Sequence, residues 1–201
     1  GKAIADKKAE LQDLVDRYAA LPEDNREAAL TEVFEGKPYA RSQATLDALD
    51  AALKVQEDLI ADALAAINDY LTTEEYVYAD APAALEPNLT ILGLEIGEGS
   101  DYAKLETTEH NRKTAVFSDL NDNKPAEGYD LATLTTYFNA MVGTRLKTQQ
   151  SMDKVNNAET VADLEEISWV TLLNDHFASV TYATHSGKAI ADKKAELQDL
   201  V

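Results

Sequence analysis

Residues 42–71 read SQATLDALDAALKVQEDLIADALAAINDYL, and this stretch sets the fold class of the chain. Apolar side chains recur in it at intervals of three or four residues or small multiples of these: Leu46, Leu49, Leu53, Ile60, Leu64, Ile67 and Leu71. That spacing places them along one face of an α-helix. Ser42 is suited to cap the first turn. The stretch therefore predicts a long helix that packs against other helices.

Four further segments carry helical periodicity. The predicted helices are residues 2–20, 23–34, 130–156 and 160–185. Leu21-Pro22 separates the first two, because proline cannot donate a backbone hydrogen bond. Thr160 and Asp163 resemble a capping box at the start of the last helix, with Asp in place of the usual Glu.

The pattern changes between residues 72 and 128. Tyr76–Tyr78, Leu89–Ile96 and Thr114–Phe117 are typical of short strands or extended loops, and prolines and glycines separate them. We therefore expect a mainly α fold, an antiparallel three- or four-helix bundle with a small β or irregular insertion at 72–128. Helices 42–71, 130–156 and 160–185 would form the bundle, and helix 2–20 would dock on it or extend from a preceding copy.

An exact internal repeat gives the domain organisation. Residues 187–201, GKAIADKKAELQDLV, are identical to residues 1–15, a spacing of 186 residues. Fifteen identities indicate near-identical tandem copies, with residues 1–186 as one unit and 187–201 as the start of the next. An engineered duplication is the alternative. Arrays of identical domains are typical of stalks, adhesins and fibres, and rare among enzymes.

The junction between copies has two predicted forms. No proline interrupts the passage from the predicted helix 160–185 into residues 187–201. Fused into one helix, about 40 residues would span roughly 60 Å. Alternatively, Ser186 and Gly187 end one helix and start the next.

Composition excludes several classes of function. The formal net charge of −19 disfavours nucleic acid as a partner. The chain has no cysteine, which excludes disulfides, thiolate metal sites and cysteine nucleophiles. No apolar run reaches the roughly 20 residues of a membrane helix, so we expect no membrane insertion.

The most specific motif is DLNDNKPAEGYD at residues 119–130. Its oxygen-bearing side chains occupy loop positions 1, 3, 5, 9 and 12: Asp119, Asn121, Asn123, Glu127 and Asp130. Hard Ca²⁺ takes six to eight oxygen ligands, and the stretch resembles an EF-hand loop at these positions. It departs where Lys124 replaces the usual Gly and Asp130 the usual Glu. The alternative is a turn that caps the next helix, with Asp130 as N-cap.

Other candidate residues are fewer. Tyr76, Tyr78 and Tyr102 lie in the predicted insertion, where exposed aromatics would form a binding surface; packing within the insertion is the alternative. The histidines His110, His176 and His185 show no zinc spacing, and no nucleophile or phosphate-binding motif is present. A glycan-cleaving enzyme would need two converging carboxylates, and no sequence feature selects such a pair.

Residues 154–167, KVNNAETVADLEEI, resemble the interhelical turn of three-helix modules in Gram-positive surface proteins. Exact repetition, acidity and absence of cysteine are similar to the giant cell-wall adhesins of the same class. The resemblance implies an extracellular, cell-wall-anchored array whose partners are adjacent copies and a host protein, matrix protein or glycan. We therefore expect a non-enzymatic spacer or stalk domain with multivalent adhesion and no cofactor. The alternative is a structural or ligand-binding module stiffened by Ca²⁺ at residues 119–130.

Overall fold

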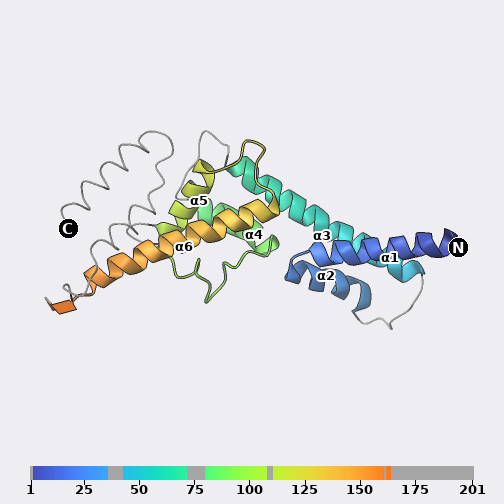
Figure 1. Ribbon diagram of the computed structural model, residues 1–201, viewed down its shortest axis with the longest axis horizontal. Coiled ribbons are helices and arrows are strands. Elements are labelled where there is room, and N and C mark those ends of the chain that lie inside the picture. The colour runs from blue at the N-terminus through green and yellow to red at the C-terminus, as the bar shows by residue number, and fades with distance from the viewer. Residues whose placement is uncertain (1, 36–42, 72–79, 108–110, 161, 164–201) are drawn as a thin grey trace. The chain divides into compact units, whose positions relative to one another are not determined.

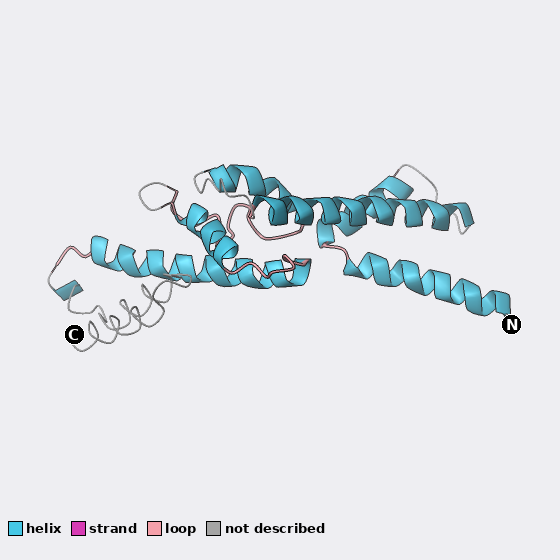
Figure 2. Ribbon diagram, turned by 90° about the horizontal axis from the view of Figure 1, so that it is seen from above, coloured by secondary structure: helices cyan, strands magenta, loops and turns pink. Residues whose placement is uncertain are grey.

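The computed structural model describes residues 2–35, 43–71, 80–107, 111–160 and 162–163, and within these ranges it is mainly helical (Figure 1). Figure 2 shows helices and loops there and no strand. The helices are α1 (Lys2–Ala20), α2 (Glu23–Phe34), α3 (Gln43–Tyr70), α4 (Ala81–Ile91), α5 (Arg112–Asp122) and α6 (Leu131–Asn156). The helices predicted at 2–20, 23–34, 42–71 and 130–156 are confirmed to within a residue or two.

The chain forms two compact units. Unit 1 comprises residues Gly1–Ile67 and Pro87–Leu94, and unit 2 comprises Asn68–Glu86 and Glu95–Val201. Two of the boundaries between these units fall within α3 and α4.

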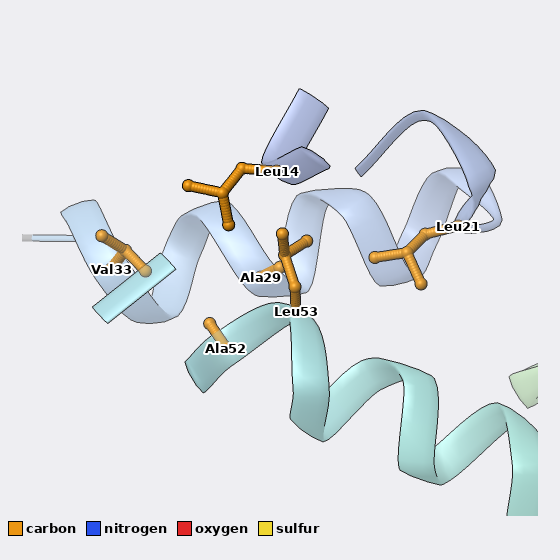
Figure 3. Close-up of a cluster of buried hydrophobic side chains, with 6 residues drawn as sticks. All are labelled: Leu14, Leu21, Ala29, Val33, Ala52 and Leu53. Carbon is orange, nitrogen blue, oxygen red and sulfur yellow. The ribbon is translucent and has the colours of Figure 1, made fainter. Parts of the chain in front are cut away.

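Unit 1 has a small apolar core where three helices meet. α1 contributes Leu14 and, just beyond its end, Leu21; α2 contributes Ala29 and Val33; α3 contributes Ala52 and Leu53 (Figure 3). Tyr18, Phe34, Leu46, Leu49 and Ile60 pack around these residues. The amphipathic faces read from sequence therefore meet one another. The N-terminal helix docks in this core.

Ion pairs fix the direction of the helices in unit 1. Arg17 of α1 contacts Glu57 of α3 through Nε–Oε1 at 2.7 Å and Nη2–Oε2 at 3.0 Å, and it also pairs with Asp50. Nearer the start of both helices, Lys7 bonds to Gln43. α1 and α3 therefore run in the same direction, and α2, which follows the turn at Leu21-Pro22, runs in the opposite direction (Figure 1).

Where the structure describes it, the insertion consists of α4 and α5 joined by turns and coil, so the strand alternative is wrong for both Leu89–Ile96 and Thr114–Phe117. Residues 89–91 belong to α4, and Leu92–Ile96 are turn and coil. The helix ends in a Schellman motif: Leu94 N donates to Leu89 O and Gly93 N donates to Thr90 O, both at 3.0 Å. Gly93 has a φ of +71°, a conformation that favours glycine.

Residues 114–117 form part of α5 instead of a strand. The Asn111 side chain accepts a hydrogen bond from Thr114 N at 3.2 Å and caps the helix. α5 buries Val116, Phe117 and Leu120. The third predicted strand, Tyr76–Tyr78, lies outside the described residues.

Unit 2 contains α5, α6 and the segment around Tyr102. α6 buries Leu134, Phe138, Val142 and Leu146, one residue per turn. The ring of Tyr102 meets the rings of Phe117 at 6.2 Å and Phe138 at 5.4 Å between centroids. Aromatic packing between α5 and α6 thus forms the centre of this core.

The chain turns after α6 as the sequence predicts. Asn157 N donates to Asp153 O at 2.9 Å and ends the helix. Thr160 N then donates to Asp163 Oδ2 at 2.8 Å, and Asp163 N donates to Thr160 Oγ1 at 3.2 Å. This reciprocal pair is the expected capping box. The rest of the predicted helix 160–185 and the repeat 187–201 lie outside the described residues.

None of the helices in the described ranges combines the length and the apolar character that crossing a membrane requires.

Candidate functional site

The acidic stretch 119–130 divides between two helices and a turn. Asp119 and Asn121 lie in the last turns of α5, and Asp130 is the N-cap of α6. Residues two apart on a helix point to different sides, so Asp119 and Asn121 do not project as they would from a calcium-binding loop. Asp130 Oδ1 accepts from Thr133 N at 2.7 Å. The alternative prediction, a turn that caps the next helix with Asp130, is confirmed.

Asp119 forms a buried ion pair across the α5–α6 contact. Its side chain is 2% exposed, and both carboxylate oxygens meet the guanidinium of Arg145. Arg145 Nε donates to Oδ2 at 2.7 Å, and Nη2 donates to Oδ1. This two-pronged geometry is the strongest that Arg and a carboxylate make. The first residue of the predicted calcium site is therefore engaged by a cation from the protein itself.

Asn68, near the end of α3, holds the turn that precedes α6. Its Oδ1 accepts from Tyr129 N at 2.7 Å, and its Nδ2 donates to Tyr129 O at 2.9 Å. The side-chain amide thus pairs with the backbone of Tyr129 as a strand neighbour would. Tyr129 is buried, and its hydroxyl donates to Leu120 O at 2.8 Å.

Lys124 and Gly128 also lie against Asn68 at this turn. Lys124 Nζ donates to Asn68 O at 2.7 Å, so a cation satisfies a carbonyl in the last turn of α3. Gly128 has a φ of +87°, and a Cβ there would lie 2.9 Å from Asn68 Oδ1. The residue that departs most from a calcium loop, Lys124, therefore has a structural task.

The remaining predicted ligands lie on the turn. Asn123 Nδ2 donates to the backbone oxygen of Asp119 at 2.7 Å, and Glu127 is exposed. In the part of the chain that the structure describes, no three His, Cys, Asp or Glu side chains are grouped to hold a metal ion. Calcium binding at Asp119, Asn121, Asn123, Glu127 and Asp130 stays a prediction.

A cluster of polar side chains near the Asp119–Arg145 ion pair was not expected from the sequence; its members are Arg112, Glu106 and Gln149. Arg112 is 8% exposed, and its Nε lies 3.8 Å from Glu106 Oε2. Burial lowers the pKa of Arg112, and Glu106 opposes that shift. Gln149 of α6 accepts from Glu106 N at 2.7 Å and donates to Lys104 O at 3.0 Å. These contacts tie the segment before α5 to α6, and no local motif reveals them.

Tyr102 is not part of an exposed binding surface, which corrects that prediction. It is 1% exposed, and its hydroxyl donates to Glu86 Oε1 at 2.9 Å. Lys113 Nζ lies 4.6 Å from the centre of its ring. Burial and the bond to Glu86 raise the pKa of Tyr102. The alternative, a packing tyrosine, is confirmed for this residue; Tyr76, Tyr78 and the three histidines lie outside the described residues.

Exposed apolar side chains gather on α1 in unit 1. Ile4 is 74%, Leu11 42% and Val15 58% exposed. Spaced seven and four residues apart, they lie on one face of the helix, and we call them the α1 stripe. Large apolar side chains grouped on a surface often mark an interaction site.

Comparison with known protein families, curated proteins and solved structures finds no match.

Proposed function

We propose that this chain is one unit of a tandem array in an extracellular surface protein, where it acts as a spacer or stalk and contributes to multivalent adhesion without catalysis. One observation carries the proposal, the identity of residues 187–201 with residues 1–15. A unit that recurs at a fixed spacing is typical of repeat proteins, whose size is set by the number of copies.

The helices support a role in setting distance. α3 has 28 residues and α6 has 26, which corresponds to about 42 and 39 Å of helix. The net charge of −19 keeps copies apart. In this proposal, reach grows with the number of copies, and weak contacts along the array gain strength through effective concentration.

The bundle arrangement is also part of the proposal. The turn at Asn157 and the capping box of Thr160 and Asp163 support an antiparallel return of segment 160–185 along α6. Together with α3 these segments would make the predicted antiparallel bundle, and α1 of the next copy would follow directly.

Small-angle scattering on chains of one, two and four copies tests the spacer role. The largest dimension should grow in proportion to copy number, because each copy adds a fixed length. Growth as the cube root of mass would mean that copies collapse on one another, and it would contradict the proposal. Adhesion is tested on immobilised albumin and collagen and on a glycan array, where four copies should bind about 10²-fold or more tightly than one.

The calcium-stiffened alternative makes a different prediction. It requires a rise in the unfolding midpoint with millimolar Ca²⁺ and no equal rise with Mg²⁺ at the same ionic strength. Because Arg145 already neutralises Asp119, we expect no such difference. A rise specific to Ca²⁺, lost in Glu127→Gln, would favour the alternative.

A further inference from the structure

The α1 stripe is exposed although Leu14 and Tyr18 of the same helix pack in the core, and α1 also extends beyond its neighbour α2. α1 has 19 residues and α2 has 12, a difference of about 10 Å of helix. The chain reverses at Leu21-Pro22, so the excess length lies at the N-terminal end of α1. Ile4, the most exposed large apolar residue among those described, lies at this end. A partner that covers the whole stripe must therefore lie along α1 and reach its N-terminal end.

The repeat identifies what lies next to the start of α1 in an array. Residue 187 corresponds to residue 1, so each α1 follows directly after a copy of segment 160–186. This segment carries the apolar periodicity of a helix, with Ile167, Phe177 and Val180 among its members. Because it is covalently tethered to α1, its effective concentration at the stripe is high.

Charge complementarity favours the same occupant. Residues 157–186 hold five carboxylates and no lysine or arginine. Residues 2–8, the start of α1, hold Lys2, Lys7 and Lys8 against the single Asp6. A separate chain would instead bring a net charge of −19 towards another of −19. The tethered segment is therefore favoured over an unlinked second copy.

We propose that, in tandem copies, segment 160–186 of one copy turns back at residues 184–187 and lies along α1 of the next copy, covering Ile4, Leu11 and Val15. This inference rests on the proposed array and selects the turned junction over the continuous helix. Gly187 permits the turn, since glycine adopts backbone conformations that other residues avoid. The segment then packs between α6 of its own copy and α1 of the next, in an up-down-up order.

The 201-residue chain tests this directly, because it contains both the segment and the next α1 sequence. It has no cysteine, so cysteines introduced by Thr171→Cys and Gln198→Cys carry the only labels. A continuous helix would separate these positions by about 40 Å, whereas a hairpin places them across helix axes about 10 Å apart. We expect the short distance by pulsed electron resonance or energy transfer. A distance near 40 Å overturns the inference and leaves the array standing, whereas cube-root growth in scattering overturns the array itself.

The repeat supplies a matched control. Ile190→Asp with Leu197→Asp should abolish the short distance, because these residues correspond to Ile4 and Leu11 in the next copy. Ile4→Asp with Leu11→Asp makes the same changes in identical sequence at the other end, where no preceding copy is present, and should leave the distance unchanged. Equal effects of the two pairs, or no effect of either, would contradict the assignment of the stripe.

Discussion

The buried pair of Asp119 and Arg145 joins α5 to α6 within unit 2. Arg145→Met would leave the Asp119 carboxylate, 2% exposed, without its cation. Breaking a buried pair in this way costs about 3–5 kcal/mol. We expect a loss of this size in the free energy of unfolding of unit 2, measured by urea denaturation with hydrogen exchange to localise it.

The control replaces both partners. Arg145→Met with Asp119→Leu removes the stranded charge and should recover most of the loss. Arg17→Met in unit 1, where Asp50 and Glu57 are far more exposed than Asp119, should cost about 1 kcal/mol or less. A single variant at Arg145 as mild as Arg17→Met would show that the ion pair does not hold α5 to α6.

Gly93 combines two constraints at one position. Its φ is +71°, and a Cβ would lie 2.7 Å from Pro22 Cβ, an atom of a rigid ring. The backbone alone costs an alanine about 1–2 kcal/mol, and the contact adds to this. We therefore expect Gly93→Ala to lower the free energy of unfolding of unit 1 by about 2 kcal/mol or more, measured in urea.

Substitutions at two other glycines distinguish the backbone cost from the cost of the contact with Pro22. Gly99 has a φ of +88° with open space around the added Cβ, so Gly99→Ala should show the backbone cost alone. Gly143 lies within α6 with open space, and Gly143→Ala should stabilise by about 1 kcal/mol. If Gly93→Ala and Gly99→Ala lower the free energy of unfolding equally, Pro22 moves away from the added Cβ at no energetic cost.

Among the elements, α6 gives a pH dependence that can be assigned to one residue. Hydrogen bonds from Thr133 hold the pKa of Asp130 below its ordinary value. Its stabilising effect is therefore present above the unfolded pKa of about 3.9 and is lost as pH falls through the lower folded value. Asp130→Asn keeps an acceptor without charge, so its unfolding midpoint should fall less between about pH 5 and about pH 2.

Circular dichroism at 222 nm measures this effect. Asp62→Asn on α3 removes one exposed carboxylate that caps no helix, and it should follow the unsubstituted chain. If Asp130→Asn loses stability in acid as steeply as the Asp62 variant, the cap does not account for the pH dependence.

The sequence predicted some helices correctly and missed α4 and α5, and the reasons lie in their local sequence. α1, α3 and α6 are long enough to show a helical apolar period, and α2, though only 12 residues long, is bounded by Pro22 and Gly36-Lys37-Pro38 in the sequence. α4 and α5 have 11 residues each, too few for a clear period. Pro87 inside α4 and the run Thr114–Phe117 favoured non-helical structure locally. Packing of Leu85 and Phe117 into the interior outweighs that preference.

For the whole molecule, the excess of negative charge predicts a response to salt. Raising NaCl from about 0.1 M to about 1 M shortens the screening length from about 10 Å to about 3 Å. Self-repulsion in a chain with net charge −19 then falls, so the unfolding midpoint at pH 7 should rise. Near the sequence pI of about 4.4 the same change should have little effect. An unfolding midpoint that does not change with salt at pH 7 would mean that local ion pairs offset the repulsion between the carboxylates.

The sequence alone determined the repeat, the charge, the absence of cysteine and the helices α1, α2, α3 and α6, because each follows from identity, composition, local periodicity or helix-ending residues. Only the tertiary structure decided which partners the side chains of the candidate site contact. Asp119 meets Arg145, Asn68 holds Tyr129, and Tyr102 packs between Phe117 and Phe138. These partners lie 15 to 61 residues apart in the chain. A local pattern carries no information on such pairings, since they arise from the packing of helices that the sequence specifies one at a time.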